Sequence, residues 1–506
     1  MNQVRVRFAP SPTGGLHLGG MRTVLYNYLF ARQHSGIFIL RIEDTDQTRF
    51  VEGAEEYIFN CLEWCGLLPD ESTRKEGAYG PYRQSERKQN YYQYAQQLVD
   101  AGFAYYAFDT PEELEDMREK FKTQENPSPQ YDHKTRLQMR NSLSLSNEEW
   151  MKLMEKETPY VIRIKMPENE TVHFKDMIRG DISFDTNLVD DKVLLKADGM
   201  PTYHLAVVVD DYLMKITHAF RGEEWLPSAP VHLLLWKYLG WGGQMPQWAH
   251  LPLILKPDGN GKLSKRDGDR LGFPVFPMNW TDPKTGELTE GFKERGFLPE
   301  AFVNMLALLG WSSGSEQELF SLEELIKNFS IERVHKGGAK FDYEKAKWFN
   351  HQYIMKTPDE QLTSLVKPFI VKNTSAFIED AFLIKIISLI KERCHLLADF
   401  WEQGNFFFET PTTIDLESIK GKWNDTKKAF FENWISGFDQ LDWSHDTLEQ
   451  SFNNEMEKAA LKKGDVLLPF RIMLVGGKYG PGVFDIATLI GKEETKKRIE
   501  NTLRLL

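Results

Sequence analysis

Two short clusters of residues in this 506-residue chain have the composition of a phosphate-binding site. In the first, His17 precedes Gly19 and Gly20 at the start of a helix-forming segment. Bare backbone N–H groups at a helix N-terminus attract anions. In the second, residues 262–266 place three cations and a serine within five positions. Neither the Gly-x-Gly-x-x-Gly fingerprint nor the Gly-Lys-Ser/Thr P-loop fits the first cluster, which indicates a third way of holding phosphate.

The cationic cluster is a weak signal when it is taken alone. A pair of lysines on a glycine-rich loop ordinarily lies on a solvated surface. The glycines at 259, 261 and 268 and the proline at 257 predict a mobile loop that follows a short apolar strand over 252–255. If the loop is functional, its cations form a compact clamp for an anion.

The elements that must position the first cluster are a strand, a turn, a helix and a second strand. Residues 4–8 alternate apolar and basic side chains, residues 21–33 contain helix formers, and residues 36–42 form a buried apolar run. This order predicts a parallel pair of strands with a right-handed crossover. Because ligands bind at the carboxyl ends of such strands, Arg7 and Glu43 should face one crevice.

Some of the acidic residues after the second strand have an alternative explanation. Glu43, Asp44 and Asp46 could cap a helix over about 53–65. We expect Asp46 and Thr48 to act as caps, and Arg41 and Glu43 to belong to the site.

A second pair of elements brings further polar residues to the same edge. The apolar run that begins at Asp191 predicts that the sheet resumes there, and a turn at 198–202 leads into a helix that starts near Tyr203. The next strand, over 216–225, presents Arg221, Glu224 and Trp225 at its carboxyl end. Arg221 could form a surface salt bridge with a neighbouring glutamate, or it could recognise a carboxylate in the crevice.

The bulk composition is that of a globular protein, with 41% hydrophobic and 27% charged residues. The length suggests about three or four domains. A net charge of −12 means that any nucleic acid must bind at a local basic patch.

No apolar run reaches the roughly 18 residues of a membrane span, and no signal core follows the N-terminus. With only three cysteines, we expect no disulfide framework and a cytoplasmic location.

Cys61 and Cys65 would lie on the same side of their helix, four residues apart. Metal binding is the alternative role for this pair, but no histidine or third cysteine lies nearby in the sequence. We therefore expect buried small hydrophobic side chains and no metal ligands.

The two clusters together resemble the signatures of class I aminoacyl-tRNA synthetases. Residues 17–20 resemble their His-Ile-Gly-His element, and residues 262–266 resemble their Lys-Met-Ser-Lys-Ser loop. The surrounding sequence is similar more specifically to the bacterial glutamyl-tRNA synthetases, and the similarity extends into their helical anticodon-binding region. The segments that carry it are 7–14, 41–46, 198–203, 207–211, 221–225 and 341–353.

The resemblance implies an α/β Rossmann-like nucleotide-binding catalytic domain with an inserted α/β subdomain, followed by an all-α C-terminal anticodon-binding region. The expected segments are 1–103 and 191–256 for the two catalytic halves, 104–190 for the inserted, acceptor-binding subdomain, and 257–335 for the cationic loop and stem-contact helices. Residues 336–506 are expected to form the anticodon-binding region, as two subdomains.

The resemblance also implies the reaction and its residues. ATP would activate L-glutamate as glutamyl-adenylate, and the glutamyl group would pass to the 3′ end of tRNA(Glu). The implied catalytic residues are His17, Lys262 and Lys265. The ATP-binding residues would be His17, Gly19, Gly20, Glu224, Trp225, Lys265 and Arg266. The glutamate-binding residues would be Arg7, Ser11, Glu43, Tyr203 and Arg221, with Arg221 forming a bidentate contact to the side-chain carboxylate.

Two departures from the family pattern have consequences. Gly20 replaces the second histidine of the His-Ile-Gly-His element, so His17 alone supplies an imidazole. Cysteines that bind zinc in some members are missing at 106–109 and 131–133, so no structural zinc is expected. Mg²⁺ would arrive with ATP. We expect a monomer with no membrane association.

Two other functions are compatible with parts of this pattern. A glutamate-activating paralogue that modifies a tRNA base would share the catalytic signatures but lack the helical C-terminal region. A non-catalytic tRNA-binding or protein-binding paralogue should have lost His17 or Lys265, and both are present.

Overall fold

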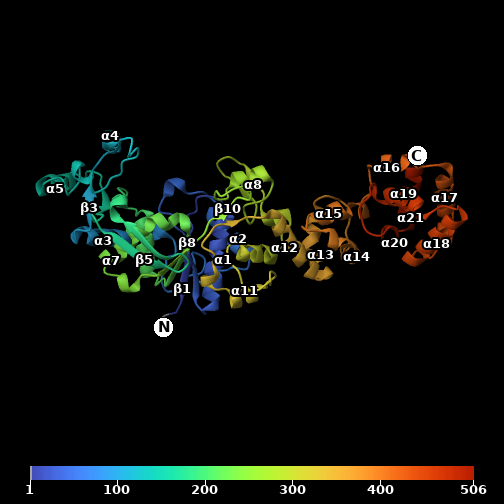
Figure 1. The fold of residues 1–506 in the computed structure, drawn as a ribbon, viewed down its shortest axis with the longest axis horizontal. Helices are drawn as coiled ribbons and strands as arrows, with labels where there is room; N and C mark the ends of the chain where they lie inside the picture. The colour runs from blue at the N-terminus through green and yellow to red at the C-terminus, as the bar shows by residue number, and fades with distance from the viewer. Residues whose placement is uncertain (1–2) are drawn as a thin grey trace. The chain divides into compact units, whose positions relative to one another are not determined.

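The computed structural model describes residues 3–506, which form two units. The first unit extends to Glu294 and includes Pro299–Tyr343, and the second consists of Arg295–Leu298 and Glu344–Leu506. The first unit runs from blue to yellow in Figure 1, and the second is orange to red. No helix among residues 3–506 is both long enough and apolar enough to cross a membrane.

A four-stranded parallel sheet is the frame of the first unit. Its strand order is β2-β1-β8-β9, and β1 pairs with β2 in register from Arg5 opposite Ile37 to Phe8 opposite Leu40. The predicted strand–helix–strand unit is therefore confirmed. The strands and the crossover helix are β1 (Arg5–Phe8), α1 (Leu18–Gln33), β2 (Ile37–Leu40), β8 (His218–Gly222) and β9 (Gln247–Leu251).

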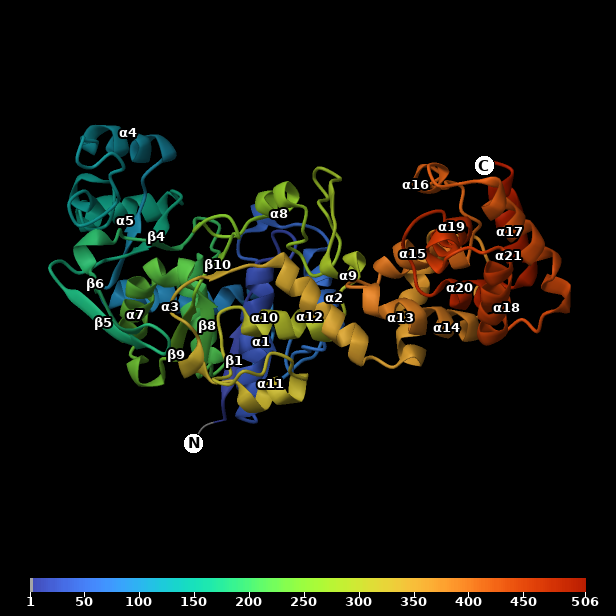
Figure 2. The ribbon, with the colours of Figure 1, turned by 45° about the vertical axis from the view of Figure 1, so that its right-hand side comes forward.

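Helix α1 begins at Leu18, three residues before the predicted start at Met21. The reason is its N-cap: the His17 imidazole accepts a hydrogen bond from the Gly19 N–H, which extends the helix through the two glycines. The helix packs beside α10 (Pro299–Leu308), as Figure 2 shows, and the Tyr26 hydroxyl donates to the Ala307 carbonyl at 3.0 Å.

The inserted region builds a separate antiparallel sheet, in the order β3-β4-β7, and a two-stranded hairpin. The run that begins at Asp191 does not resume the parallel sheet as expected, because β7 pairs with β4; the parallel sheet resumes at β8. A short apolar run has no feature that identifies its partner. These elements are β3 (Ala104–Ala107), α4 (Pro111–Phe121), α5 (Asn147–Glu155), β4 (Val161–Ile164), β5 (Thr171–Asp176), β6 (Gly180–Asp185) and β7 (Val193–Leu195).

The expected capping role of Asp46 is only partly correct. Its carboxylate accepts from the Thr48 N–H and caps a short 3-10 turn at Gln47–Arg49, whereas α2 is preceded by Gly53 at a φ of 80°. The remaining elements of the first unit are α2 (Ala54–Trp64), α3 (Lys88–Asp100), α6 (Tyr203–Leu213), α7 (Ala229–Tyr238), β10 (Ile254–Leu255), α8 (Lys265–Leu271), β11 (Trp280–Thr281), β12 (Leu288–Thr289), α9 (Phe292–Arg295), α11 (Leu322–Asn328) and β13 (Ala339–Lys340).

The second unit is helical, and aromatic side chains fill its core. Trp434 lies between Phe452 and Phe470, with ring centroids 4.9 and 5.0 Å away. Lys427 is buried in this unit and donates to the Lys422 carbonyl. The helices are α12 (Tyr343–Lys356), α13 (Asp359–Val371), α14 (Asp380–Ile390), α15 (Asp399–Gly404), α16 (Glu417–Lys420), α17 (Asp425–Ser436), α18 (His445–Lys458), α19 (Lys463–Val475), α20 (Val483–Ile490) and α21 (Lys492–Leu503).

The two segments of the insertion that lack the family's zinc-binding cysteines, 106–109 and 131–133, are joined by a hydrogen bond between Tyr131 and Asp109. The buried Tyr131 hydroxyl donates to Asp109 at 2.9 Å and accepts from the Asn141 amide at 2.9 Å. We expect Tyr131→Phe to destabilise the inserted subdomain by about 1–3 kcal/mol, because both groups lose a buried hydrogen-bonding partner. Thermal unfolding and hydrogen exchange in β3 measure this, with Tyr479→Phe at an exposed tyrosine as control. Unchanged exchange in β3 would contradict the role of this hydroxyl.

Candidate active site

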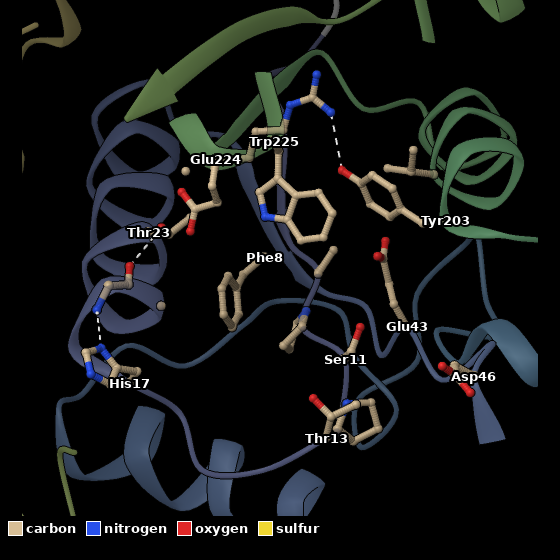
Figure 3. A pocket seen from close by; sticks show the side chains of 18 of the residues that line it. Phe8, Ser11, Thr13, His17, Thr23, Glu43, Asp46, Tyr203, Glu224 and Trp225 are labelled. Atoms are coloured by element: carbon tan, nitrogen blue, oxygen red, sulfur yellow. Dashed lines mark hydrogen bonds between the residues drawn. The ribbon is translucent and has the colours of Figure 1, made fainter. Parts of the chain in front are cut away.

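A cavity of about 1180 Å³ opens at the carboxyl ends of β1 and β8 (Figure 3). Two of the residues that were expected in the site do not line it: Arg266 is exposed on α8, and Arg41 is buried outside the cavity lining. The expected residues that line it are Arg7, Ser11, His17, Gly19, Gly20, Glu43, Tyr203, Arg221, Glu224, Trp225, Lys262 and Lys265. Figure 3 shows His17 at the start of α1, with Glu43 and Tyr203 across the cavity.

The His17 imidazole is fixed at the mouth of α1. Its Nδ1 accepts from the Gly19 N–H at 3.5 Å, so the ring proton resides on Nε2. Nε2 is buried and has no hydrogen-bond partner among residues 3–506. Gly20 fits closely against Leu16: a Cβ at position 20 would lie 2.5 Å from the Leu16 side chain, which would then have to move. The site therefore offers an unpaired imidazole N–H at the N-terminus of α1.

Burial and the nearby charge of Lys262 lower the pKa of His17 to about 4. The imidazole is therefore neutral at physiological pH and acts as a hydrogen-bond donor without a charge. We expect kcat/KM for ATP to show no inflection from His17 between about pH 5.5 and 8.5. Parallel pH profiles for the wild type and His17→Asn check this, since asparagine cannot titrate. An inflection that disappears only in the variant would contradict it.

The two lysines of the cationic cluster both rest on carboxylates. Lys262 Nζ lies 2.5 Å from Glu224 Oε1, and Lys265 Nζ lies 2.8 Å from Glu287 Oε2. The cluster was expected to lie wholly in a loop, but Lys265 is the first residue of α8. Ser264 and Asp267 form a capping box at the start of this helix. Such exposed ion pairs contribute little stability, so an incoming phosphate can replace either carboxylate.

Arg7 and Arg41 share one buried carboxylate behind the cavity. Asp211 accepts from Arg7 Nε at 3.0 Å and from Arg41 Nη1 at 2.8 Å, and Arg41 Nη2 donates to Glu43 at 2.9 Å. Burial alone would raise the pKa of Asp211, but the two guanidinium groups hold it below its usual value. The sequence did not indicate Asp211 as their common partner. The network fixes Arg7 and Glu43 at the floor of the cavity.

Arg221 is buried at the end of β8, and neither neighbouring glutamate pairs with it. Its Nε donates to His250 Nε2 at 2.9 Å, and its Nη1 lies 3.3 Å from the Tyr203 hydroxyl and 3.0 Å from His232 Nδ1. Its Nη2 is buried without a hydrogen-bond partner in the described part of the chain. The surface salt bridge is therefore excluded as an explanation of this residue, because Glu224 pairs with Lys262.

Trp225 and Tyr203 form an aromatic wall of the cavity. Their ring centroids lie 4.6 Å apart, and the Trp225 side chain is 44% exposed. A planar group can stack on an exposed indole of this kind.

Residues 3–506 contain no cluster of three or more His, Cys, Asp or Glu side chains arranged to hold a metal ion. Cys61, Cys65 and Cys394 are buried free thiols, and burial raises the pKa of each. Their chemistry is therefore that of small hydrophobic side chains, as expected.

The fold and these residues have a match among known families. Residues 3–348 match the family described as "tRNA synthetases class I (E and Q), catalytic domain", and residues 361–503 match "Anticodon binding domain". The chain belongs to this class I tRNA synthetase family. The predicted fold class and the predicted enzyme class, an aminoacyl-tRNA synthetase, are thereby confirmed.

Relatives of this synthetase are similar over their whole length. A glutamate–tRNA ligase of Flavobacterium johnsoniae is 52% identical over 507 residues, which cover 100% of this chain and 99% of that one. One from Porphyromonas gingivalis is 51% identical, with the same coverage. The crystal structure of a glutamate tRNA ligase from Elizabethkingia meningosepticum, in complex with its amino acid, matches with a TM-score of 0.95 at 49% identity and covers 100% of both chains.

Proposed function

We propose that the chain is a glutamate–tRNA ligase that uses ATP to activate L-glutamate and transfers the glutamyl group to the 3′ end of tRNA(Glu). The observation that carries this proposal is the unpaired, buried Nη2 of Arg221 in a cavity that also holds Glu43. A free cation and a carboxylate in one cavity suit an amino acid with a second carboxylate. The full-length relatives named as glutamate–tRNA ligases support the same assignment over a tRNA-modifying or non-catalytic paralogue.

Arg221 and Tyr203 would hold the side-chain carboxylate of glutamate. Arg221 Nε and Nη1 already bond to His250 and His232, so Arg221 cannot make the expected bidentate contact through these two groups. Because the Tyr203 hydroxyl accepts from Arg221 Nη1, its own proton can be donated. Nη2–H and Tyr203 O–H then supply two donors to one carboxylate. Glu43 would hold the α-ammonium group, with Arg7 and Ser11 near the α-carboxylate.

ATP would occupy the other half of the cavity. The His17 Nε2–H would bind a phosphate oxygen beside Gly19 and Gly20, with the Gly19 N–H kept by His17 Nδ1, and Trp225 would flank the adenine. Lys262 and Lys265 would leave their carboxylates to bind the phosphates, with Arg266 as a further cation. Mg²⁺ enters as part of the ATP complex.

The first step is attack of the glutamate α-carboxylate oxygen on the α-phosphorus of ATP, which breaks the bond to pyrophosphate. In the second step, a hydroxyl of the terminal tRNA ribose attacks the glutamyl carbonyl and releases AMP. The protein supplies positioning and charge stabilisation for both steps.

Pyrophosphate exchange tests this proposal directly. We expect ATP–pyrophosphate exchange with glutamate only when tRNA(Glu) is added, followed by charging of that tRNA. Exchange with tRNA but no aminoacylated tRNA would favour the base-modifying paralogue, and no exchange under any condition would favour a non-catalytic one. Charging of tRNA(Gln) in a parallel assay measures whether the enzyme discriminates between the two tRNAs.

The remaining parts of the chain would serve the tRNA. We assign residues 104–190 to its acceptor end, residues 257–335 to its stem and residues 336–506 to its anticodon. The chain would act in the cytoplasm as a monomer. Light scattering after size-exclusion chromatography measures the mass directly, and a mass of twice 58.8 kDa would contradict the monomer.

A further inference from the structure

A pair of buried side chains behind Arg221 has no role in the mechanism above. Asp176, the last residue of β5, accepts a hydrogen bond from His250 Nδ1 at 2.6 Å. On the opposite side of the ring, His250 Nε2 accepts from Arg221 Nε at 2.9 Å. Asp176 is 1% and His250 is 0% exposed, so water does not replace either contact.

The donors around Asp176 determine which nitrogen of His250 carries the proton. The carboxylate also accepts the backbone N–H groups of Ile178 and Arg179, each at 2.9 Å, and that of His250 at 3.1 Å. A carboxylate that receives this many donors is ionised, and it holds the imidazole proton on Nδ1. Nε2 is then a lone pair directed at the Arg221 guanidinium.

Neutral rings on two sides orient Arg221 without cancelling its charge. His232 Nδ1, the second ring acceptor, lies 3.0 Å from Nη1, and its own Nε2 faces His204 Nδ1 at 3.3 Å. No carboxylate among the described residues forms an ion pair with Arg221, whereas Arg7 is paired directly with Asp211. Burial lowers the pKa of His232 and of His250, which keeps both rings uncharged beside the guanidinium.

The carboxylate of this pair comes from the inserted subdomain. The end of β5 attaches to the open edge of the parallel sheet, where the Met177 N–H donates to the Trp248 carbonyl at 2.8 Å. Figure 2 shows the hairpin strand β5 beside β9. The insertion therefore reaches back to the strand that lies next to Arg221.

We propose that Asp176 and His250 are positioning residues for amino-acid recognition, which fix the rotation of Arg221 so that Nη2 points into the cavity. Because this inference assigns Arg221 to the glutamate side chain, it rests on the function proposed above. In this arrangement the Asp176 charge stays one imidazole ring away from Arg221. The guanidinium is thus held rigidly while its positive charge remains available to the substrate carboxylate.

Two substitutions at His250 separate positioning from structure. In His250→Phe the acceptor for Arg221 Nε is lost, and we expect the KM for glutamate in pyrophosphate exchange to rise at least about tenfold, with the KM for ATP within about twofold. In His250→Gln the amide oxygen can occupy the Nε2 position, and most of the affinity for glutamate should return. Gln247→Ala, at the exposed start of the same strand, is the control and should match the wild type.

Equal rises in both KM values, or a His250→Gln enzyme as weak as His250→Phe, would overturn the proposal. A second measurement on the ligand-free, full-length protein does not depend on activity. Nitrogen-15 NMR of the imidazoles should show His250 protonated only on Nδ1 and His232 only on Nε2, with the signals assigned from their loss in the His250→Gln and His232→Gln variants. A His250 proton on Nε2 would overturn the positioning role, whereas correct tautomers without glutamate-dependent exchange would overturn only the proposed function.

Discussion

Replacing Lys265 with alanine is expected to slow glutamate-dependent pyrophosphate exchange by about 100-fold or more, while the KM for glutamate changes less than about twofold. Lys265 lines the cavity, and among residues 3–506 its carboxylate partner is Glu287, which does not line it. A cation that reaches the phosphates only as charge develops on them stabilises the transition state more than the bound substrates. The rate should therefore fall much further than the affinity.

The matched control for this variant is Lys284→Ala, because Lys284 is an exposed lysine between β11 and β12 that does not line the cavity. Exchange by this control should equal that of the wild type. A Lys265→Ala enzyme that loses rate and glutamate affinity by the same factor would contradict the assignment, as would a control that is equally slow.

Asp211→Asn should destabilise the first unit by about 3–5 kcal/mol, because an amide cannot balance the two buried guanidinium groups that share this carboxylate. Arg41 is 0% and Arg7 is 4% exposed, so neither can turn to water. The same change should raise the KM for glutamate, since it releases Arg7. Hydrogen exchange in peptides that cover β1 and β8 reports the loss locally.

The pH dependence of this effect has a definite sign. Because the folded-state pKa of Asp211 is depressed, its contribution to stability is present above the unfolded value of about 3.9 and is lost as the pH falls through the folded value. The deficit of the Asn variant should thus shrink in strong acid. Asp439→Asn, at an exposed pair with Lys492, is the control and should leave exchange unchanged. Equal exchange in the wild type and Asp211→Asn would contradict the network.

Local sequence patterns were sufficient to predict the frame of the site. A period-two strand, a glycine turn and a helix identified β1 and α1, and the rule for parallel strands correctly brought Arg7 and Glu43 to one cavity. The same reasoning failed for β7, because three apolar residues can join either a parallel or an antiparallel sheet. Pairing depends on distant residues that a local pattern does not contain.

The residues that the sequence did not indicate are those that act behind the cavity. Asp210 and Asp211 are adjacent on α6, and a rotation of about 100° per residue sends them to different partners, Arg87 and Arg7. The local sequence does not indicate whether Asp210 or Asp211 points toward the site. Asp176 and His250 lie 74 positions apart and meet only because a hairpin of the insertion reaches β9.

If ATP binds as proposed, the two lysine–carboxylate pairs of Lys262 and Lys265 make its entry an exchange of counter-ions. Lys262 and Lys265 are already neutralised by Glu224 and Glu287 before ATP arrives, so the gain on binding is the difference between a phosphate and a carboxylate. Added salt weakens both kinds of pair. ATP affinity should therefore depend less steeply on ionic strength than the number of cations at this loop suggests, and the freed carboxylates stand ready to recapture the lysines when pyrophosphate departs.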